Sequence, residues 1–148
     1  MKRTWVSVPI VAIVVAIAWE GLGRGEPLSS KSLTGVEWRV RELSGHAIAP
    51  SLNRQQPFIF LDSEKKQASG YAGCNRFFGG YELEGEALTF GPIAATKRAC
   101  PDLEEAVETE FLKVLDSTRR WRIVDGTLEL LKGDLVLVRL HPHHDHGS

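Results

Sequence analysis

The two cysteines, Cys74 and Cys100, carry the most distinctive chemistry of this chain. They lie 26 positions apart and form no C-x-x-C motif, which argues against a thioredoxin-like redox pair. A zinc site would need two more ligands. If the chain is exported, a disulfide is the simplest hypothesis, because disulfides persist outside the reducing cytosol. Two buried free thiols are the alternative.

Glycines gather around the first cysteine. Four of them fall within residues 70–80, on both sides of Cys74-Asn75-Arg76. This density predicts positive φ angles or a close approach of chains. A phosphate cradle is the functional alternative, but the Walker pattern and its Lys-Ser/Thr pair are missing. We interpret Gly73, Asn75 and Arg76 as a structural loop that is also a candidate binding site: Asn75 can bond its own backbone, and Arg76 can reach a carboxylate or carbonyl.

The histidines are the remaining candidates for metal ligation or base catalysis. His46 is the only one inside the predicted domain, in a glycine-flanked connection that is typical of a solvated loop. The other four form a C-terminal cluster, His141, His143, His144 and His146. Neutral imidazole binds Zn²⁺, Ni²⁺ and Cu²⁺, so this tail is a weak metal-binding candidate, and a solvated chain end is the alternative. The sequence shows no recognisable combination of base, nucleophile and oxyanion donors, so we expect no catalytic residues and no cofactor.

Composition narrows the class of protein. The chain has 148 residues, which suits one domain, with 43% hydrophobic and 25% charged residues. The 18 basic and 19 acidic side chains give a net charge of −1. A nucleic-acid-binding protein would need a basic face to neutralise phosphates, so we expect no nucleic-acid partner.

The N-terminus resembles a targeting segment. Lys2 and Arg3 precede an uncharged run from Thr4 to Trp19, which is shorter than the about 20 residues of a membrane-spanning helix. An A-x-A-like site ends at Ala18, so we interpret residues 1–18 as a secretory signal peptide. An uncleaved membrane anchor is the alternative. Residues 19–32 have the composition of a flexible linker.

From residue 33 onward, short apolar runs alternate with turn residues, which predicts a mostly β domain over residues 33–140, followed by the His-rich tail 141–148. A hairpin is expected to open at Gly79-Gly80, turn at residues 84–86 and end at Pro92. The other predicted strands cover residues 36–43, 58–61 and 68–71, and a closing meander over 121–124, 128–131 and 135–140 turns at Asp125-Gly126 and at residues 132–134.

One amphipathic helix is expected to begin at Pro101-Asp102. Asp102 can cap it, and Glu105 completes a capping-box pattern. Apolar residues then recur at helical spacing and predict the face packed on the sheet: Leu103, Ala106, Val107, Phe111, Val114 and Leu115.

Several of these segments together resemble the META domain family, which includes the bacterial heat-shock protein HslJ. The matching pieces are GCNRF at residues 73–77, Gly80-Tyr81 with LTF at 88–90, TKRACP at 96–101 and TGVEW at 34–38. The resemblance covers about residues 33–140. Phe78 departs from it, since a small polar residue is commoner at that position.

The resemblance implies an α+β fold with a mostly antiparallel, curved, cracked-barrel-like sheet and one helix. It also implies an association with stress response and the cell envelope, and no established catalytic activity. We therefore expect a non-enzymatic, periplasmic or otherwise extracytoplasmic protein that acts by binding an envelope protein or a lipid.

The alternative function is a carrier of lipid or small hydrophobic molecules. It would use the concave face of the sheet and would need an apolar pocket there. Eight aromatic residues could line that pocket, although most are expected to form the core: Trp38, Phe58, Phe60, Phe77, Phe78, Tyr81, Phe90 and Trp121.

Overall fold

The computed structural model describes residues 33–49 and 55–143. The predicted signal segment, the linker, His144 and His146 lie outside these ranges. The described chain forms nine strands and one long helix, in the order β1 (Glu37–Leu43), β2 (His46–Ala47), β3 (Phe58–Asp62), β4 (Gln67–Tyr71), β5 (Arg76–Glu84), β6 (Ala87–Ala95), α2 (Asp102–Ser117), β7 (Arg120–Val124), β8 (Thr127–Lys132) and β9 (Leu135–His143). No helix in these ranges is long and apolar enough to span a bilayer.

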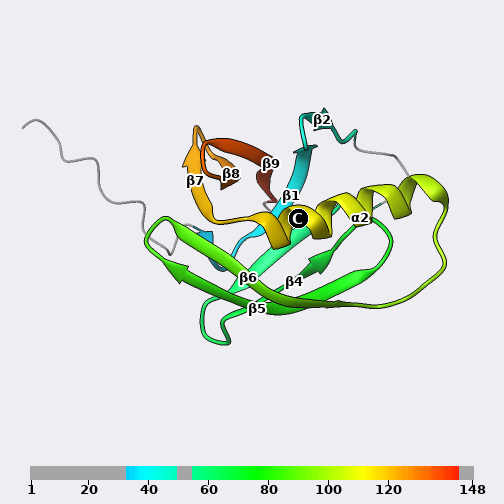
Figure 1. Cartoon of the computed structure of the whole chain (residues 1–148), viewed down its shortest axis with the longest axis horizontal. Helices are drawn as coiled ribbons and strands as arrows, with labels where there is room; N and C mark the ends of the chain where they lie inside the picture. The colour runs from blue at the N-terminus through cyan, green and yellow to red at the C-terminus, as the bar shows by residue number, and fades with distance from the viewer. Residues whose placement is uncertain (1–32, 50–54, 144–148) are drawn as a thin grey trace, which may run out of the picture.

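The strands form one antiparallel sheet, which is strongly curved (Figure 1). Each of β3 to β6 pairs with the next strand, β7 to β9 form a meander, and β1 pairs with both β3 and β9. Between β6 and β7 only Ala87 and Arg120 are in register. The sheet is therefore curved but is not a closed barrel, which confirms the predicted α+β fold class.

The turns of this sheet follow local chemistry. Asp125 and Gly126 both have positive φ, at 49° and 76°, which is the geometry of the tight hairpin that Asp-Gly favours. Gly85 at the β5–β6 turn has φ 57°. The predicted hairpins at these two places are confirmed.

Two predicted strand ends are wrong. Gly79 and Gly80 lie inside β5, and Pro92 lies inside β6, where the β5–β6 register shifts between Gly79 and Tyr81. Such an irregularity tolerates a proline and lets the strands continue. The last strand also passes the predicted end at residue 140, because His141 and His143 pair with β1 opposite Arg39 and Glu37.

The helix α2 covers the inner face of the sheet between β6 and β7 (Figure 1). Its buried residues are Phe111, Val114 and Leu115, and the Phe111 ring meets Phe77 of β5 edge-to-face at 5.9 Å between centroids.

The predicted N-cap of this helix is wrong. Pro101 is the N-cap and makes no side-chain cap hydrogen bond, while Asp102 is already helical. The Pro101 carbonyl accepts the first helical hydrogen bond, from the Glu105 backbone N–H at 3.1 Å.

The aromatic residues divide between the core and the surface. Of the eight that could have lined a pocket, five are buried in the core cluster: Trp38, Phe77, Tyr81, Phe90 and Trp121. Phe58 and Phe60 are partly buried, and Phe78 is 50% exposed. The expectation that most of them form the core is therefore confirmed.

An ionic ladder crosses the outer face of the closing meander. Glu129 of β8 lies opposite Arg122 of β7 and Arg139 of β9, and its carboxylate accepts hydrogen bonds from both at 2.6 and 2.9 Å. Arg139 also pairs with Glu42 of β1. Burial raises the pKa of Glu129, but the two arginine hydrogen bonds outweigh burial, so the net pKa lies below its ordinary value. The ladder therefore links four strands through one buried charge.

Glu129→Gln is expected to lower the free energy of unfolding by about 1–2 kcal/mol at pH 7, because two charge-assisted hydrogen bonds weaken. A lowered folded-state pKa means that the stabilisation is present above the ordinary carboxyl pKa and is lost as pH falls through the folded value. Urea unfolding at several pH values should therefore show the difference from wild type shrinking in acid. Glu82→Gln, at an exposed position of β5, is the matched control and should show neither effect.

Candidate functional site

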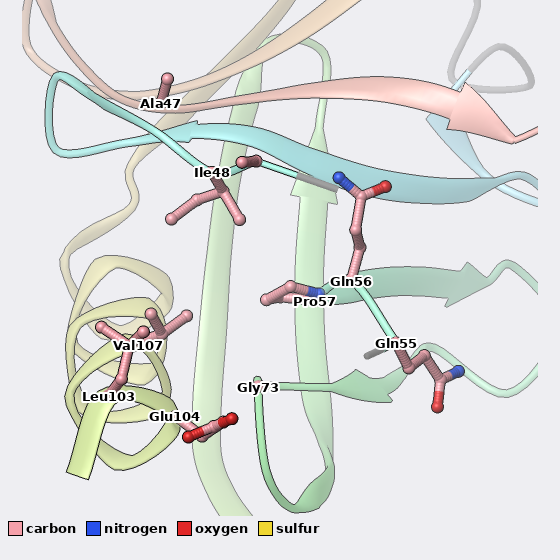
Figure 2. Close-up of a pocket in the computed structure, with 10 residues that line it drawn as sticks. Ala47, Ile48, Gln55, Gln56, Pro57, Gly73, Leu103, Glu104 and Val107 are labelled. Atoms are coloured by element: carbon pink, nitrogen blue, oxygen red, sulfur yellow. The ribbon is translucent and has the colours of Figure 1, made fainter. Parts of the chain in front are cut away.

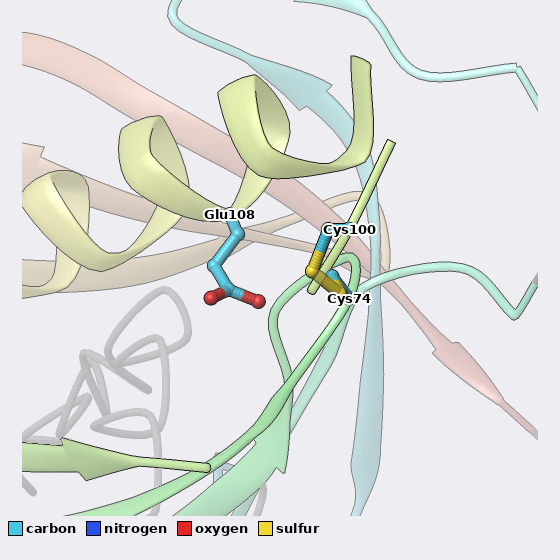
Figure 3. Close-up of side chains that lie close together, drawn as sticks. All are labelled: Cys74, Cys100 and Glu108. Carbon is cyan, nitrogen blue, oxygen red and sulfur yellow. A yellow bond between two sulfur atoms is a disulfide. The ribbon is translucent and has the colours of Figure 1, made fainter. Parts of the chain in front are cut away.

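The cysteines and their loop meet the start of the helix. Residues 72–75, here called the Cys74 loop, connect β4 to β5, and Cys100 lies two residues before α2. A disulfide joins Cys74 to Cys100 with their Cα atoms 6.0 Å apart, and Glu108 points toward it from the helix (Figure 3). The structure supports the pairing hypothesis of the sequence over the alternative of two free thiols.

Asn75 is the polar centre of this region and is only 5% exposed. Its Oδ1 accepts hydrogen bonds from the Arg98 backbone N–H at 2.8 Å and the Thr96 hydroxyl at 3.2 Å. Its Nδ2 donates to Glu108 Oε1 at 3.0 Å, and its backbone N–H donates to Glu108 Oε2 at 2.6 Å. Asn75 therefore bonds far beyond its own turn and holds the Cys74 loop, the segment after β6 and α2 together.

The arginine that fastens the loop is Arg98 rather than Arg76. Arg98 Nη2 donates to the Cys74 carbonyl at 2.9 Å. Arg76 is exposed, and its guanidinium has no hydrogen-bond or ion-pair partner among the described residues. Its backbone is engaged, because it bonds Thr96 and lies in register with Tyr71 of β4. The predicted pinning role of Arg76 is therefore wrong, because Arg76 is the first residue of β5 and its side chain faces outward.

Two glycines are required by the backbone here. Gly73 has φ 127°, and a Cβ on it would lie 3.2 Å from Val107 and 3.3 Å from the Glu104 carbonyl. A Cβ on Gly70 would lie 2.0 Å from the Phe58 carbonyl oxygen. The structural interpretation of the glycine cluster is confirmed, since these residues allow the loop and strand to approach their neighbours.

A groove opens beside this loop, between the first turns of α2 and the ends of β2 and β3. Its volume is about 320 Å³. Figure 2 shows Leu103 and Val107 on the helix across from Ile48 and Pro57, and Gly73 of the Cys74 loop also lines the groove. Leu103 was expected to pack on the sheet but is 68% exposed, because the first turns of α2 extend beyond the core. The groove was not predicted from the sequence.

None of the three histidines that the structure describes takes part in this region. His46 is exposed in β2, with Nδ1 3.0 Å from the Ser44 carbonyl. His141 Nε2 lies 3.3 Å from the Thr127 hydroxyl, on the ordered strand β9. Metal binding by the C-terminal cluster, which includes His144 and His146 outside the described residues, stays a prediction.

Sequence reasoning missed Glu108, Arg98 and Thr96 as partners of Asn75. A signal was present for the last two, since they belong to the segment TKRACP that follows β6. Glu108 gave none, because an acid in the first half of a helix is explained by the helix dipole alone.

Comparison with known proteins agrees with this architecture. An NMR structure of a protein from Burkholderia xenovorans is similar with a TM-score of 0.64 and 21% identity, over 84% of this chain and 94% of that one. A second NMR structure has a TM-score of 0.60 and 19% identity, over 76% and 94% of the two chains. These similarities concern the fold alone. No protein with a curated description matches this chain.

The family comparison extends over most of the sequence. A family model described as the META domain matches residues 31–143, which include every described strand and the helix. This range agrees with the segments that suggested the resemblance and continues to the end of β9. The chain belongs to the META domain family.

Proposed function

We propose that this protein is a non-enzymatic, exported META domain of the cell envelope that serves in stress tolerance by binding extended apolar segments of other polypeptides. The observation that carries the proposal is the groove between α2 and the ends of β2 and β3. Its volume of about 320 Å³ is within the range of specific ligand sites. It suits a few side chains of a partner rather than a whole lipid.

The walls of the groove support an apolar occupant. Ile48, Pro57, Leu103 and Val107 line it, and Leu103 is one of the few large apolar side chains that the described surface leaves more than half exposed. Covering such a side chain would contribute about 25 cal/mol per Å² of apolar area removed from water. Hydrophobic contact is therefore the main expected source of affinity.

The groove also has polar edges. Gln55 and Glu104 belong to its lining beside the apolar residues. A polypeptide, whose backbone carries hydrogen-bonding groups, suits such a mixed lining better than an alkyl chain does.

Export is supported by two independent features. The uncharged run at residues 4–19 follows a basic start and ends near an A-x-A-like site. The disulfide between Cys74 and Cys100 is of the kind that persists in oxidising compartments. The carrier alternative has no comparable support, because the described aromatic residues on the concave side mostly belong to the packed core.

Leu103→Asp tests the binding role. Full-length wild type should suppress light scattering by an aggregating, chemically denatured protein, and the variant should lose at least half of this effect because a charge enters the apolar groove. Leu135→Asp is the matched control: Leu135 is 65% exposed at the start of β9, away from the groove, and its replacement should change nothing. Equal suppression by wild type and Leu103→Asp would contradict the proposal.

A further inference from the structure

We propose that the Cys74–Cys100 pair becomes a zinc site when its disulfide is reduced, with Glu108 as a third ligand. One donor atom from each of these three residues lies within 4.8 Å of the others. Thiolate and carboxylate are both established zinc ligands. The three residues come from different segments of the chain, and the fold brings them together.

A backbone oxygen can supply the fourth ligand. The Arg98 carbonyl oxygen lies 3.2 Å from Cys100 Sγ and 3.9 Å from Cys74 Sγ. In a tetrahedral zinc site, with bonds of about 2.3 Å to sulfur and about 2.1 Å to oxygen, neighbouring donors are roughly 3.4–3.8 Å apart. The two Sγ atoms need to separate for this geometry. The Arg98 carbonyl oxygen is slightly too close to Cys100 Sγ and slightly too far from Cys74 Sγ, so small shifts bring it to a suitable distance from both. This carbonyl or a water molecule would take the fourth position.

The Glu108 ligand is already oriented. Asn75 donates to both of its oxygens, from Nδ2 and from the backbone N–H. An ionised carboxylate has about four lone-pair positions, so it can accept these bonds and still ligate a metal. Hydrogen bonds of this kind fix the ligand and typically contribute 10–100-fold to metal affinity. Asn75 would thus act as a positioning residue for the ion.

The surroundings favour negatively charged sulfur and allow entry. Cys100 precedes the positive end of α2, and the Arg98 guanidinium bonds the Cys74 carbonyl. Both features place positive charge near the pair and offset part of the repulsion between the sulfur atoms and the Glu108 carboxylate. A cavity of about 260 Å³, lined in part by Cys74, Arg98 and Glu104, adjoins the Cys74 end of the disulfide. A reductant and then the ion could reach the sulfur atoms from this side.

The chemistry balances with a dithiol reductant. It supplies two electrons and two protons, the S–S bond breaks, two thiols form, and the reductant becomes a disulfide. Zn²⁺ then displaces the two thiol protons and forms two Zn–S bonds. A low-molecular-weight disulfide can reverse the process: it takes two electrons from the zinc-bound thiolates, the Cys74–Cys100 bond forms again, and the ion is released. The two small thiolates produced take up two protons from water. The ion would replace the covalent link between the Cys74 loop and α2 whenever that link is lost.

The test compares the oxidised full-length chain with the same chain reduced by a phosphine and desalted without oxygen. Titration with Zn²⁺ against a chromophoric chelator should show one more ion bound per reduced chain than per oxidised chain. The C-terminal histidines are present in both forms, so their binding cancels in this difference. Co²⁺ should give a sulfur-to-cobalt charge-transfer band with the reduced chain only.

Glu108→Gln should weaken zinc binding by the reduced chain at least about 10-fold. Glu105→Gln, an exposed acid on the same helix, is the matched control and should bind as wild type does. Circular dichroism of each reduced sample distinguishes weak binding from loss of fold. Equal zinc stoichiometry in the two redox states, a missing charge-transfer band, equal affinities of the two variants, or a reduced chain that stays unfolded with zinc would each overturn the proposal.

Discussion

Asn75→Ala is expected to lower the free energy of unfolding by about 3 kcal/mol, because one truncation breaks several buried hydrogen bonds at once. It leaves the Arg98 backbone N–H without its acceptor and removes one of the two donors to the Glu108 carboxylate. Polar groups that lose a partner away from water cost more than the mean contribution of a hydrogen bond, and the substitution removes the Asn75 partner of two partly buried groups beside the disulfide. Urea denaturation of the oxidised chain at pH 7 measures the loss.

The neighbouring residue provides the control for this prediction. Arg76→Ala removes a larger side chain, but that side chain is exposed and has no partner among the described residues, so the expected change is within about 0.5 kcal/mol. The contrast between two adjacent positions separates the Asn75 network from a general sensitivity of the loop. Similar losses for both variants would show that the loop, rather than the network, limits stability.

Removing the disulfide should have an effect of similar size. On the chain-entropy model, closing a loop over this separation of 26 residues stabilises the fold by roughly 3–4 kcal/mol. The double variant Cys74→Ser, Cys100→Ser is therefore expected to lose that amount in urea denaturation, without a change in the secondary structure seen by circular dichroism. Wild type treated with a phosphine reductant and a metal chelator should fall to the same stability.

The response to reductant distinguishes the disulfide from simple packing of the two side chains. The double serine variant should be indifferent to the phosphine, because it has no bond to lose. If oxidised wild type and the double variant unfold at the same urea concentration, the bond contributes nothing and the chain-entropy estimate is wrong for this fold.

The sequence predicted those parts of the fold that depend on local chemistry. Asp125-Gly126 has the residue types that a two-residue hairpin demands, and the apolar positions Phe111, Val114 and Leu115 have the spacing of a buried helix face. Both predictions are confirmed because hairpin geometry and amphipathic period are set by neighbours in sequence. The fold class follows from the same patterns.

Features that depend on distant partners were not predictable in this way. Glu108 lies 33 positions from Asn75, and nothing local distinguishes it from other acids of the helix. The presence of Pro92 predicts a strand end, but the irregular pairing of β5 with β6 accommodates this proline. The exposure of Leu103 depends on how far α2 extends past the core, which its own periodicity does not specify.

The central proposal is that the domain works outside the cytosol and carries the Cys74–Cys100 disulfide. The most direct test is the intact mass of the protein recovered from its own cells. The sample is alkylated in denaturant without reductant. We predict no alkyl adduct, on a chain of residues 19–148 if the signal is cleaved or on a membrane-bound full-length chain if it serves as an anchor. A soluble full-length chain that carries two adducts would contradict both the export and the disulfide.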